Sequence, residues 1–421
     1  MTADAAVGAR DGDPPAFAVQ SLGCRVNQYE SRALAGALAG AGWREVAIGD
    51  APHVIVNVCA VTEKGSRKAR RLVRRLCRAA PRRRLYVMGC ATARDRAAYL
   101  ALPQVRAVVP PPARDGLARI IAGCAGGAAP RSFGSRTRAY VKIQDGCSRR
   151  CTYCIVPLLR GPSRSRSADE IAEECRALIA GGVAEIWIVG THLDEWEGGL
   201  PALLDRIGPL FDGVSARVRL GSIGMDALDA PLLAAAARHA GLCRHFHLSL
   251  QSGSERIRRR MGRRCGLGEI RARIARCRAA LPGVMFTGDI LVGFPGEEEE
   301  DFAATAALCR EIGFLKMHVF PFSPRPGTPA ADFAGRPSAA ETASRCARLA
   351  ALERELFAAQ AGALVGRILA VVVERAGEVA EGLAAEYVRV RFAPGAVRTG
   401  SIVRVGVEDL RQGFLWGAIV A

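Results

Sequence analysis

The sequence predicts an α/β protein in three parts: an N-terminal parallel-sheet βα domain, a central partial (β/α)6 barrel and a small C-terminal β-barrel. Continuous apolar runs alternate with amphipathic helical stretches along most of the chain, which favours parallel sheets built from βα units. A stretch rich in Gly, Ala, Pro and Ser at 123–135 interrupts this alternation and indicates a linker. Because 421 residues exceed one ordinary core, several domains are expected.

The N-terminal domain is expected at residues 16–125, after a disordered N-terminus at 1–15 and before a linker at 126–137. Its apolar runs and amphipathic stretches predict strands at 16–24, 53–59, 84–90 and 105–110 and helices at 28–41, 63–79 and 93–101. Parallel strands in such a unit bring their carboxyl ends to one edge of the sheet, where ligands gather.

The central domain is expected at residues 138–360, and the C-terminal barrel at 361–421. The central strands are predicted at 139–144, 184–190, 218–223, 245–250, 286–294 and 315–323, and a long helix follows at about 338–361. In a (β/α) barrel the chemistry belongs at the C-terminal strand ends. The closely spaced short strands after residue 361, with Gly in their turns, predict the small barrel.

The composition restricts partners and location. A formal charge of +18 and a pI near 9.9 favour a polyanionic partner such as nucleic acid. The codon bias of a GC-rich genome explains the basic composition equally well, since the chain has many arginines but only four lysines. The sequence shows no secretory leader and no apolar run long enough to span a membrane, so we expect a cytoplasmic protein without a membrane partner. Because the cytoplasm keeps thiols reduced, the 14 cysteines are expected to have metal, cluster or catalytic roles rather than to form disulfides.

Three cysteines lie in the stretch GCSRRCTYCIVP, directly after a predicted strand: Cys147, Cys151 and Cys154. Three thiolates at this spacing are typical of a [4Fe–4S] cluster with one iron that has no protein ligand. A zinc site would need a fourth close ligand, which the sequence lacks at a suitable spacing. A thioredoxin-like pair of Cys151 and Cys154 is the alternative, and it leaves Cys147 without a role.

A second set is spread over the N-terminal domain. Cys24, Cys59 and Cys90 each end a predicted strand, although they are 35 and 31 residues apart. Because the carboxyl ends of parallel strands meet at one edge, we expect these three cysteines to converge. The alternative, three separate buried cysteines, fits each one singly but not all three at equivalent positions. The other eight cysteines are expected to fill cores.

The chain contains, in order, SLGCRVNQYES, VNVCAVTEKGSRKAR, YVMGCATAR, KIQDGCSRRCTYCIVP, LSLQSGSERIRRRMGRR, DILVGFPGEEEEDF and FPFSPRPGTPAA. Together they resemble consecutive blocks of the methylthiotransferase family, radical S-adenosylmethionine (SAM) enzymes with two [4Fe–4S] clusters. The resemblance covers residues 16 to about 330, and the terminal barrel is similar to a TRAM domain, an RNA-binding module. The first two stretches are most similar to the branch acting on N6-threonylcarbamoyladenosine at position 37 of tRNA.

The resemblance implies roles for both cysteine sets. Cys147, Cys151 and Cys154 would bind the cluster that cleaves SAM to a 5′-deoxyadenosyl radical, which takes hydrogen from C2 of the adenine. Cys24, Cys59 and Cys90 would bind an auxiliary cluster that carries the sulfur, and a second SAM would supply the methyl group. The resemblance also implies an electron donor such as flavodoxin or ferredoxin, and we expect a monomer.

Candidate SAM contacts are Gly190, Thr191, Ser222 and Gln251, all at strand ends. An ordinary polar residue at a strand end explains each of them as well. The chain departs from the family pattern where Gly224 and Met225 replace a usual Glu-Pro, and the lost carboxylate puts local SAM or substrate contacts in doubt. The stretch 191–196 and Cys265 depart as well.

Basic stretches at 64–78 and 160–167, and the alternating Arg389 and Arg391, are candidates for tRNA phosphate contacts, with a solvated helix face as the alternative for the first. The acidic run 297–300 is expected to begin a helix. Three other hypotheses stay open: a methylthiotransferase for isopentenyladenosine in tRNA, one for a ribosomal protein, and a non-catalytic Fe–S protein that binds RNA.

Overall fold

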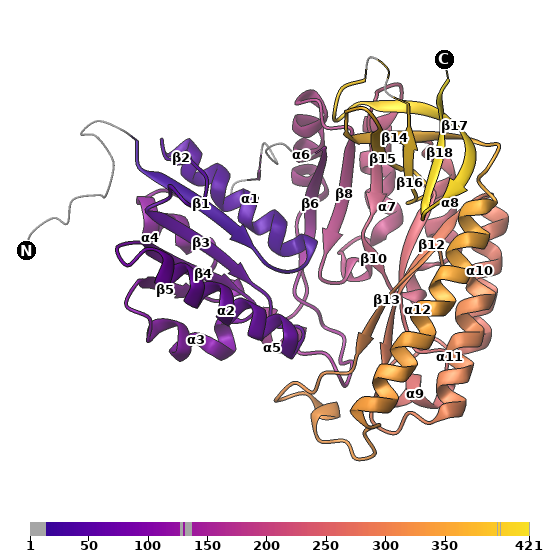
Figure 1. The fold of residues 1–421 in the computed structure, drawn as a ribbon, viewed down its shortest axis with the longest axis horizontal. Helices are drawn as coiled ribbons and strands as arrows, with labels where there is room; N and C mark the ends of the chain where they lie inside the picture. Colours follow the sequence, from indigo (N-terminus) through magenta and orange to yellow (C-terminus); the bar gives the residue numbers. More distant parts are fainter. Residues whose placement is uncertain (1–13, 127–128, 131–136, 394, 396, 421) are drawn as a thin grey trace, which may run out of the picture. The chain divides into compact units, whose positions relative to one another are not determined.

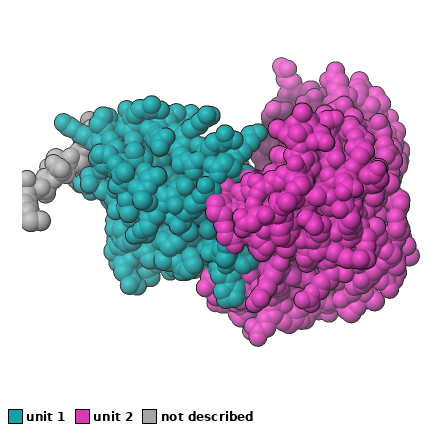
Figure 2. All heavy atoms as spheres, turned by 90° about the horizontal axis from the view of Figure 1, so that it is seen from below, with its two compact units in different colours: residues 1–132, 154–162 teal, residues 133–153, 163–421 magenta. Residues whose placement is uncertain are grey.

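The computed structural model describes residues 14–126, 129–130, 137–393, 395 and 397–420. The chain divides into two compact units, as Figure 2 shows: unit 1 comprises residues 1–132 with 154–162, and unit 2 comprises residues 133–153 with 163–421. Residues 1–13 of the expected disordered terminus, and residues 127–128 and 131–136 of the expected linker, lie outside the described residues. None of the described helices is both long and apolar enough to cross a membrane.

Unit 1 is built on a parallel five-stranded sheet in the order β2-β1-β3-β4-β5 (Figure 1). Its strands are β1 (Ala16–Ser21), β2 (Arg44–Glu45), β3 (His53–Val58), β4 (Arg84–Gly89) and β5 (Val105–Val109). Its helices are α1 (Arg25–Gly40), α2 (Glu63–Ala79), α3 (Thr92–Leu100), α4 (Gly116–Ala122) and α5 (Val156–Arg160), with a 3-10 turn η1 (Pro111–Ala113).

Both faces of this sheet are covered by helices. Val54 and Val56 of β3 pack with α2 and with Tyr99 of α3, whereas Ile55 between them packs with Leu34 of α1 and with α4. The alternation follows from the strand period of two, and it explains why the strands read as unbroken apolar runs. The predicted strands and helices of this unit are confirmed; β2, α4 and α5 were not predicted.

Unit 2 begins with the partial barrel, which consists of two four-stranded sheets in the orders β7-β6-β8-β9 and β10-β11-β12-β13. An isolated parallel bridge between Val218 and Leu242 links the two sheets. The strands are β6 (Arg138–Asp145), β7 (Arg164–Ser165), β8 (Glu185–Gly190), β9 (Arg217–Leu220), β10 (Ser222–Ile223), β11 (His245–Gln251), β12 (Met285–Val292) and β13 (Lys316–Pro321).

The predicted strand at 218–223 is divided at Gly221, which ends β9. The Gly221 N–H donates to the Ile188 carbonyl at 2.8 Å, and a Cβ at this residue would lie only 2.8 Å from the same oxygen. The other predicted central strands are confirmed.

The helices of unit 2 are α6 (Ala168–Ala180), α7 (Gly199–Ile207), α8 (Ala230–Arg238), α9 (Glu255–Arg260), α10 (Leu267–Ala280), α11 (Glu299–Ile312) and α12 (Ala339–Gly362). The 3-10 turns are η2 (Leu193–Glu195), η3 (Gly208–Phe211), η4 (Met225–Ala227) and η5 (Pro329–Ala331). The acidic run does begin a helix, since Glu298 caps α11 and forms a capping box with Asp301.

The C-terminal barrel is closed, with strand order β14-β15-β16-β18-β17. Its strands are β14 (Ile368–Arg375), β15 (Ala380–Ala384), β16 (Arg389–Phe392), β17 (Ile402–Arg411) and β18 (Phe414–Ile419). β15 was not predicted because its sequence, AEGLA, consists mainly of residues that are depleted in strands.

This barrel docks on the partial barrel through a buried polar network. Glu185 and Arg217, the first residues of β8 and β9, form an ion pair at 2.5 Å, and Arg219 lies 3.1 Å from the same carboxylate. Both arginines also donate to backbone carbonyls of the C-terminal barrel. Burial raises the pKa of Glu185, but Arg219 and Arg217 outweigh it and hold that pKa at about 2. The C-terminal barrel therefore covers the N-terminal strand ends and leaves the opposite, C-terminal ends for the site.

Candidate functional site

The structure brings the three cysteines of unit 1 to one edge of the sheet. Cys59 directly follows β3 and Cys90 directly follows β4, whose ends are paired at Val58 and Gly89. Cys24 caps the N-terminus of α1, just after β1. A Cβ on Gly23 would lie 3.0 Å from the Cβ of Cys59, which places the Cys24 segment against the end of β3. The predicted convergence of the strand ends is therefore present.

The thiols of this set influence one another. The pKa of Cys90 is raised to about 12: burial is the main cause, Arg160 opposes it, and Cys24 and Cys59 add to it. Burial also raises the pKa of Cys59, with Cys24 adding to the effect. Such mutual electrostatic effects arise only between groups that lie close together. A bound metal would relieve this cost, because its charge replaces the thiol protons.

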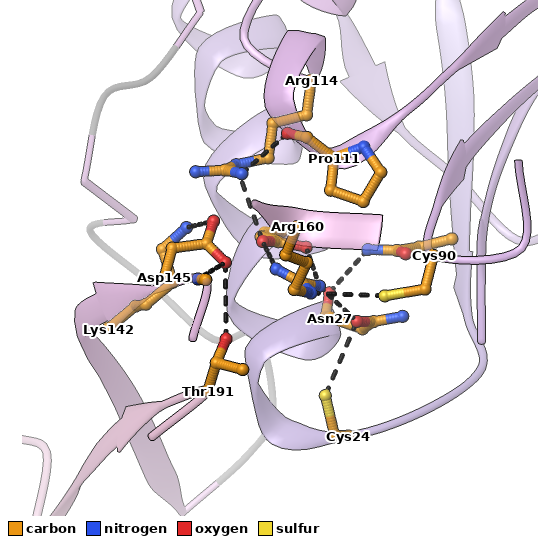
Figure 3. A network of polar contacts seen from close by, with 12 residues as sticks. Cys24, Asn27, Cys90, Pro111, Arg114, Lys142, Asp145, Arg160 and Thr191 are labelled. Carbon is orange, nitrogen blue, oxygen red and sulfur yellow. Dashed lines mark hydrogen bonds and ion pairs between the residues drawn. The ribbon is translucent and has the colours of Figure 1, made fainter. Parts of the chain in front are cut away.

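Polar side chains bond to two of these thiols, those of Cys24 and Cys90 (Figure 3). The Asn27 amide donates to the carbonyls of Leu22 and Val58 at 3.2 and 3.3 Å, which ties the ends of β1 and β3 together. The Cys24 thiol donates to Asn27 Oδ1 at 3.6 Å. Asn27 is only 1 % exposed, so its amide makes these hydrogen bonds in the interior, at the edge of the sheet, and not on the solvent-exposed surface of α1.

Arg160 of α5 reaches the same edge. Its Nε donates to Cys90 Sγ at 3.2 Å, and its two terminal nitrogens donate to Glu30 Oε1 and Asn27 Oδ1 at 2.8 and 2.9 Å. Arg114 lies 3.6 Å from the same Glu30 carboxylate. Hydrogen bonds to a ligating sulfur orient it and shift the reduction potential of a cluster.

This position corrects the prediction that Arg160 contacts tRNA phosphates: at 3 % exposure its guanidinium is committed to Glu30, Asn27 and Cys90. Arg166 of the same stretch pairs with Glu174 at 2.6 Å, whereas Arg164 is exposed. The roles of Asn27, Glu30 and Arg160 were missed. The signal for the first two was a pair of polar residues on the buried face of a helix directly after a cysteine.

The second cysteine set lies on the segment between β6 and α5. Unit 2 holds this segment as far as Tyr153: Gly146 N–H donates to Asp145 Oδ1, Ser148 N–H to Glu195 Oε2, and Thr152 N–H to the Met261 carbonyl, at 2.8–3.1 Å. The Ala330 N–H donates in turn to the Thr152 carbonyl at 2.9 Å. Cys147, Cys151 and Cys154 are each half-buried, and none of the three forms a disulfide. Backbone bonds on both sides of Cys147 and Cys151 thus fix the positions of these two residues.

Gly190, Thr191 and Gln251 lie at or directly after C-terminal strand ends of unit 2, whereas Ser222 is the first residue of the two-residue strand β10. Gly190 ends β8, and a Cβ there would lie 2.9 Å from Leu193 and 3.1 Å from Gln144. Thr191 Oγ1 donates to Asp145 Oδ1 at 3.4 Å (Figure 3), and the Ser222 hydroxyl lies 2.9 Å from that of Ser249. Gln251 ends β11 with φ +70, a backbone conformation that non-glycine residues rarely adopt.

At Gly224, where the sequence differs from the expected Glu-Pro, the carboxylate of Asp194 lies against the backbone. Asp194 in η2 accepts the Gly224 N–H with both oxygens at 2.9 and 3.1 Å, and a Cβ on Gly224 would lie 2.3 Å from Asp194 Oδ2. Glycine at 224 thus makes room for Asp194. Burial, only partly offset by the Gly224 N–H, raises the pKa of Asp194 to about 6.

Basic residues line the exposed face of α2: Lys64, Arg67, Lys68, Arg71, Arg74, Arg75 and Arg78. Arg70 differs, because it pairs with Glu63 and Asp95 at 2.9 Å. On the C-terminal barrel, Arg389 pairs with Glu381 at 2.5 Å, and the Arg391 guanidinium lies 3.5 Å from the Phe414 ring centroid. Both predicted outward arginines therefore have acidic or aromatic partners.

Comparison with known proteins follows the same division of the chain. Residues 141–309 match the radical SAM superfamily, and residues 16–110 match the uncharacterized protein family UPF0004. The threonylcarbamoyladenosine tRNA methylthiotransferase MtaB of Chlamydia pneumoniae is 33% identical over 96% of this chain and 98% of its own. The same enzyme of Bacillus subtilis is 31% identical over 94% of both chains. The chain belongs to the radical SAM tRNA methylthiotransferase family.

Other relatives fit this assignment. The tRNA-2-methylthio-N(6)-dimethylallyladenosine synthase of Sorangium cellulosum is 35% identical over 86% of this chain and 82% of its own. Among solved structures, the radical SAM methyltransferase TsrM of Kitasatospora setae has a TM-score of 0.58 at 13% identity and covers 75% of each chain, which supports the fold. As a methylthiotransferase, the protein is a transferase that uses SAM and [4Fe–4S] clusters.

Proposed function

We propose that this methylthiotransferase converts N6-threonylcarbamoyladenosine at position 37 of tRNA to its 2-methylthio derivative. Two MtaB relatives at 33% and 31% identity, each covering more than nine tenths of the chain, support the substrate. The observation that carries the reaction type is the convergence of Cys24, Cys59 and Cys90 on one sheet edge, since a generic radical SAM site needs no second cysteine triplet.

Two ligand sets would serve this reaction. Cys147, Cys151 and Cys154 would hold the SAM-cleaving cluster, and Cys24, Cys59 and Cys90 would hold the auxiliary cluster. The donors fit, because each set offers three cysteine sulfurs outside disulfides, and three thiolates leave one iron of a [4Fe–4S] cluster open for a non-protein ligand. When bound, the clusters and SAM supply the radical chemistry and the sulfur, which no side chain can provide at an aromatic C–H.

The residues around these sets would position and tune them. Arg160 and Asn27 hold the Cys90 and Cys24 sulfurs by hydrogen bonds, so they orient the auxiliary ligands. Gly190, Thr191, Ser222 and Gln251 would contact SAM at the strand ends of unit 2, with Asp194 supplying a carboxylate beside Gly224. The exposed basic face of α2 and the C-terminal barrel, which we propose to be TRAM-like, would bind tRNA phosphates.

We further propose the domain boundaries expected from the sequence, a cytoplasmic location, a monomeric state, and reduction by a flavodoxin- or ferredoxin-type donor.

The experiment is a nucleoside profile of tRNA from a strain that lacks this gene. We expect loss of 2-methylthio-N6-threonylcarbamoyladenosine, accumulation of the unmodified nucleoside, and recovery when the intact gene is returned. The same run tests the second candidate, isopentenyladenosine, which the 35% identity to a dimethylallyladenosine synthase favours. Loss of 2-methylthio-isopentenyladenosine alone would replace the first substrate by the second. An unchanged profile of both would contradict a role in tRNA.

A further inference from the structure

Outside the cysteine sets, three metal-binding side chains meet in unit 2: His247 of β11, Asp289 of β12 and His318 of β13. Their ligand atoms all lie within 4.8 Å of one another. The three strands are parallel neighbours, Asp289 is paired directly with His318, and His247 is paired with Thr287, two residues before Asp289. Because side chains alternate along a strand, this register puts all three on one face of the sheet.

The distances suit a shared ion. Asp289 Oδ1 lies 3.1 Å from His247 Nε2 and 3.4 Å from His318 Nδ1. Donors that share one ion at about 2.0–2.1 Å lie roughly 3.0–3.4 Å apart in octahedral or tetrahedral geometry. Both pairs therefore reach metal-ligand spacing without movement of the strands.

A chain of contacts behind His247 fixes its ring. His247 Nδ1 lies 2.7 Å from the Thr287 hydroxyl, which lies 2.9 Å from His245 Nε2. The His245 ring stacks on Tyr387 of the C-terminal barrel at a centroid distance of 4.4 Å. A hydrogen bond at one ring nitrogen that orients the other toward the ion is the usual support of a metal-binding histidine. Here it directs Nε2 toward Asp289.

The opposite face of β11 is apolar, since Phe246 and Leu248 are fully buried there. On the cluster's own face, His247 is 6% exposed, whereas the side chains of Asp289 and His318 are 22% and 35% exposed. The cluster is thus anchored on one side and accessible on the other. Three protein ligands with an accessible side leave coordination positions open.

We propose that His247, Asp289 and His318 form a binding site for one first-row divalent transition-metal ion, such as Zn²⁺, Fe²⁺ or Mn²⁺. Two imidazoles and one carboxylate are the donor set that these ions accept, and thiolates take no part in it. The open positions would bind an exchangeable oxygen or nitrogen ligand on the polar face of the partial barrel. The site is independent of the two cysteine sets.

Mn²⁺ is the probe of choice because it prefers oxygen and nitrogen ligands, so cysteine sites compete little for it. The full-length protein, reconstituted anaerobically with its clusters, is titrated with Mn²⁺ alone while the EPR signal of the free aquo ion is followed. We expect one ion per chain and ¹⁴N modulation from histidine in the pulsed EPR spectrum. Asp289→Asn and His318→Gln should each weaken binding by at least about tenfold.

The control is His239→Gln. His239 Nε2 lies 3.1 Å from Asp205 Oδ1, the same separation as between His247 and Asp289, but no second imidazole joins that pair among the described residues. This variant should bind Mn²⁺ like the unaltered protein. The proposal is overturned if the unaltered protein shows no stoichiometric binding, or if binding survives in both Asp289→Asn and His318→Gln; the three residues are then a hydrogen-bonded group without an ion. If the Asp289→Asn variant fails to fold, because Asp289 is the more buried of the two residues, Mn²⁺ binding by His318→Gln alone decides: binding equal to that of the unaltered protein then overturns the proposal.

Discussion

In unit 2, Cys147 and Cys151 follow a single strand, β6, and neighbouring backbone groups pin the segment that carries them. In unit 1, Cys24, Cys59 and Cys90 come from the ends of three strands, 35 and 31 residues apart, and Asn27 and Arg160 bond to the sulfurs of Cys24 and Cys90. Cys147 and Cys151 are close together because they lie in one short segment of the chain. Cys24, Cys59 and Cys90 come together only when the sheet of unit 1 is correctly folded. Changes that leave every cysteine in place should therefore damage the unit 1 site far more easily.

The largest expected effect separates the chemistry of the two sets. Cys147→Ala should abolish both 5′-deoxyadenosine formation and methylthiolation, because the cluster that we propose at Cys147, Cys151 and Cys154 would cleave SAM. Cys59→Ala should keep 5′-deoxyadenosine formation but lose the methylthiolated nucleoside. Both products are measured by mass spectrometry in one anaerobic assay with tRNA and dithionite. Cys346→Ala, a half-buried cysteine of α12, is the control and should retain both products. Loss of SAM cleavage in Cys59→Ala would mean that the two sets are not separable.

A glycine substitution tests the dependence of the unit 1 set on its fold. Gly23 has φ +132, and a Cβ there would lie 2.9 Å from Asn27 Nδ2 and 3.0 Å from Cys59 Cβ. Gly23→Ala should destabilise this edge by about 2–4 kcal/mol and reduce the iron content to about four per chain. Gly36→Ala, on α1 with open space around its Cβ, should instead stabilise by about 1 kcal/mol and keep all iron. Equal iron content in the two variants would contradict the comparison.

A smaller effect concerns the support of Cys90. Arg160→Lys keeps a positive charge beside Glu30, but one ammonium group cannot bond Cys90, Asn27 and Glu30 as the guanidinium does. The reduction potential of the unit 1 cluster should fall by roughly tens of millivolts, because a hydrogen bond to a ligand sulfur is lost. EPR-monitored redox titration measures both clusters, and the potential of the cluster proposed at Cys147, Cys151 and Cys154 should not move. The exposed Arg164→Lys is the control.

The smallest expected effect is a dependence of the protein's stability on pH, which arises from Asp194 in unit 2. Glu30 of unit 1 pairs with a guanidinium, whereas Asp194 accepts a backbone N–H and burial raises its pKa to about 6. The folded state then holds a proton between about pH 4 and 6 that the unfolded chain has released, so this stabilisation is full below pH 4 and lost as the pH rises through 6.

Asp194→Asn removes this titration. Its melting temperature should match that of the unaltered protein near pH 4 and exceed it above pH 6, by the equivalent of about 2–3 kcal/mol. Asp205→Asn is the matched comparison, because hydrogen bonds from Arg238 and His239 lower the pKa of Asp205. That variant should show no gain at high pH. A melting temperature for Asp194→Asn that follows the unaltered protein at every pH would reject the assigned pKa shift.

Much of the fold could be predicted from the pattern of apolar residues along the sequence. Apolar runs located most strands of the sheet in unit 1 and of the two sheets of the partial barrel. The convergence of the strand-end cysteines was predictable because the position of a residue in a βα repeat determines the edge of the sheet on which it lies. Short elements with weak propensity were missed: β2 has two residues, and β15 consists largely of Ala, Glu and Gly.

The partners of charged residues could not be predicted. Arg160 belongs to an arginine-rich stretch that indicates a nucleic-acid contact, yet it is buried against Glu30, 130 residues away in sequence. Asp194 accepts the Gly224 N–H because glycine leaves the space for its carboxylate, and this contact between residues 30 apart exists only in three dimensions. Long-range polar pairs of this kind leave no periodic signal.

The central claim is that the strand-end cysteines of unit 1 hold a cluster of their own. The most direct measurement is the iron content and Mössbauer spectrum of the full-length triple variant Cys147→Ala/Cys151→Ala/Cys154→Ala after anaerobic reconstitution. We expect about four irons per chain with the spectrum of one [4Fe–4S] cluster, against about eight in the unaltered protein. A triple variant that holds no cluster, while the unaltered protein holds only one, would contradict it.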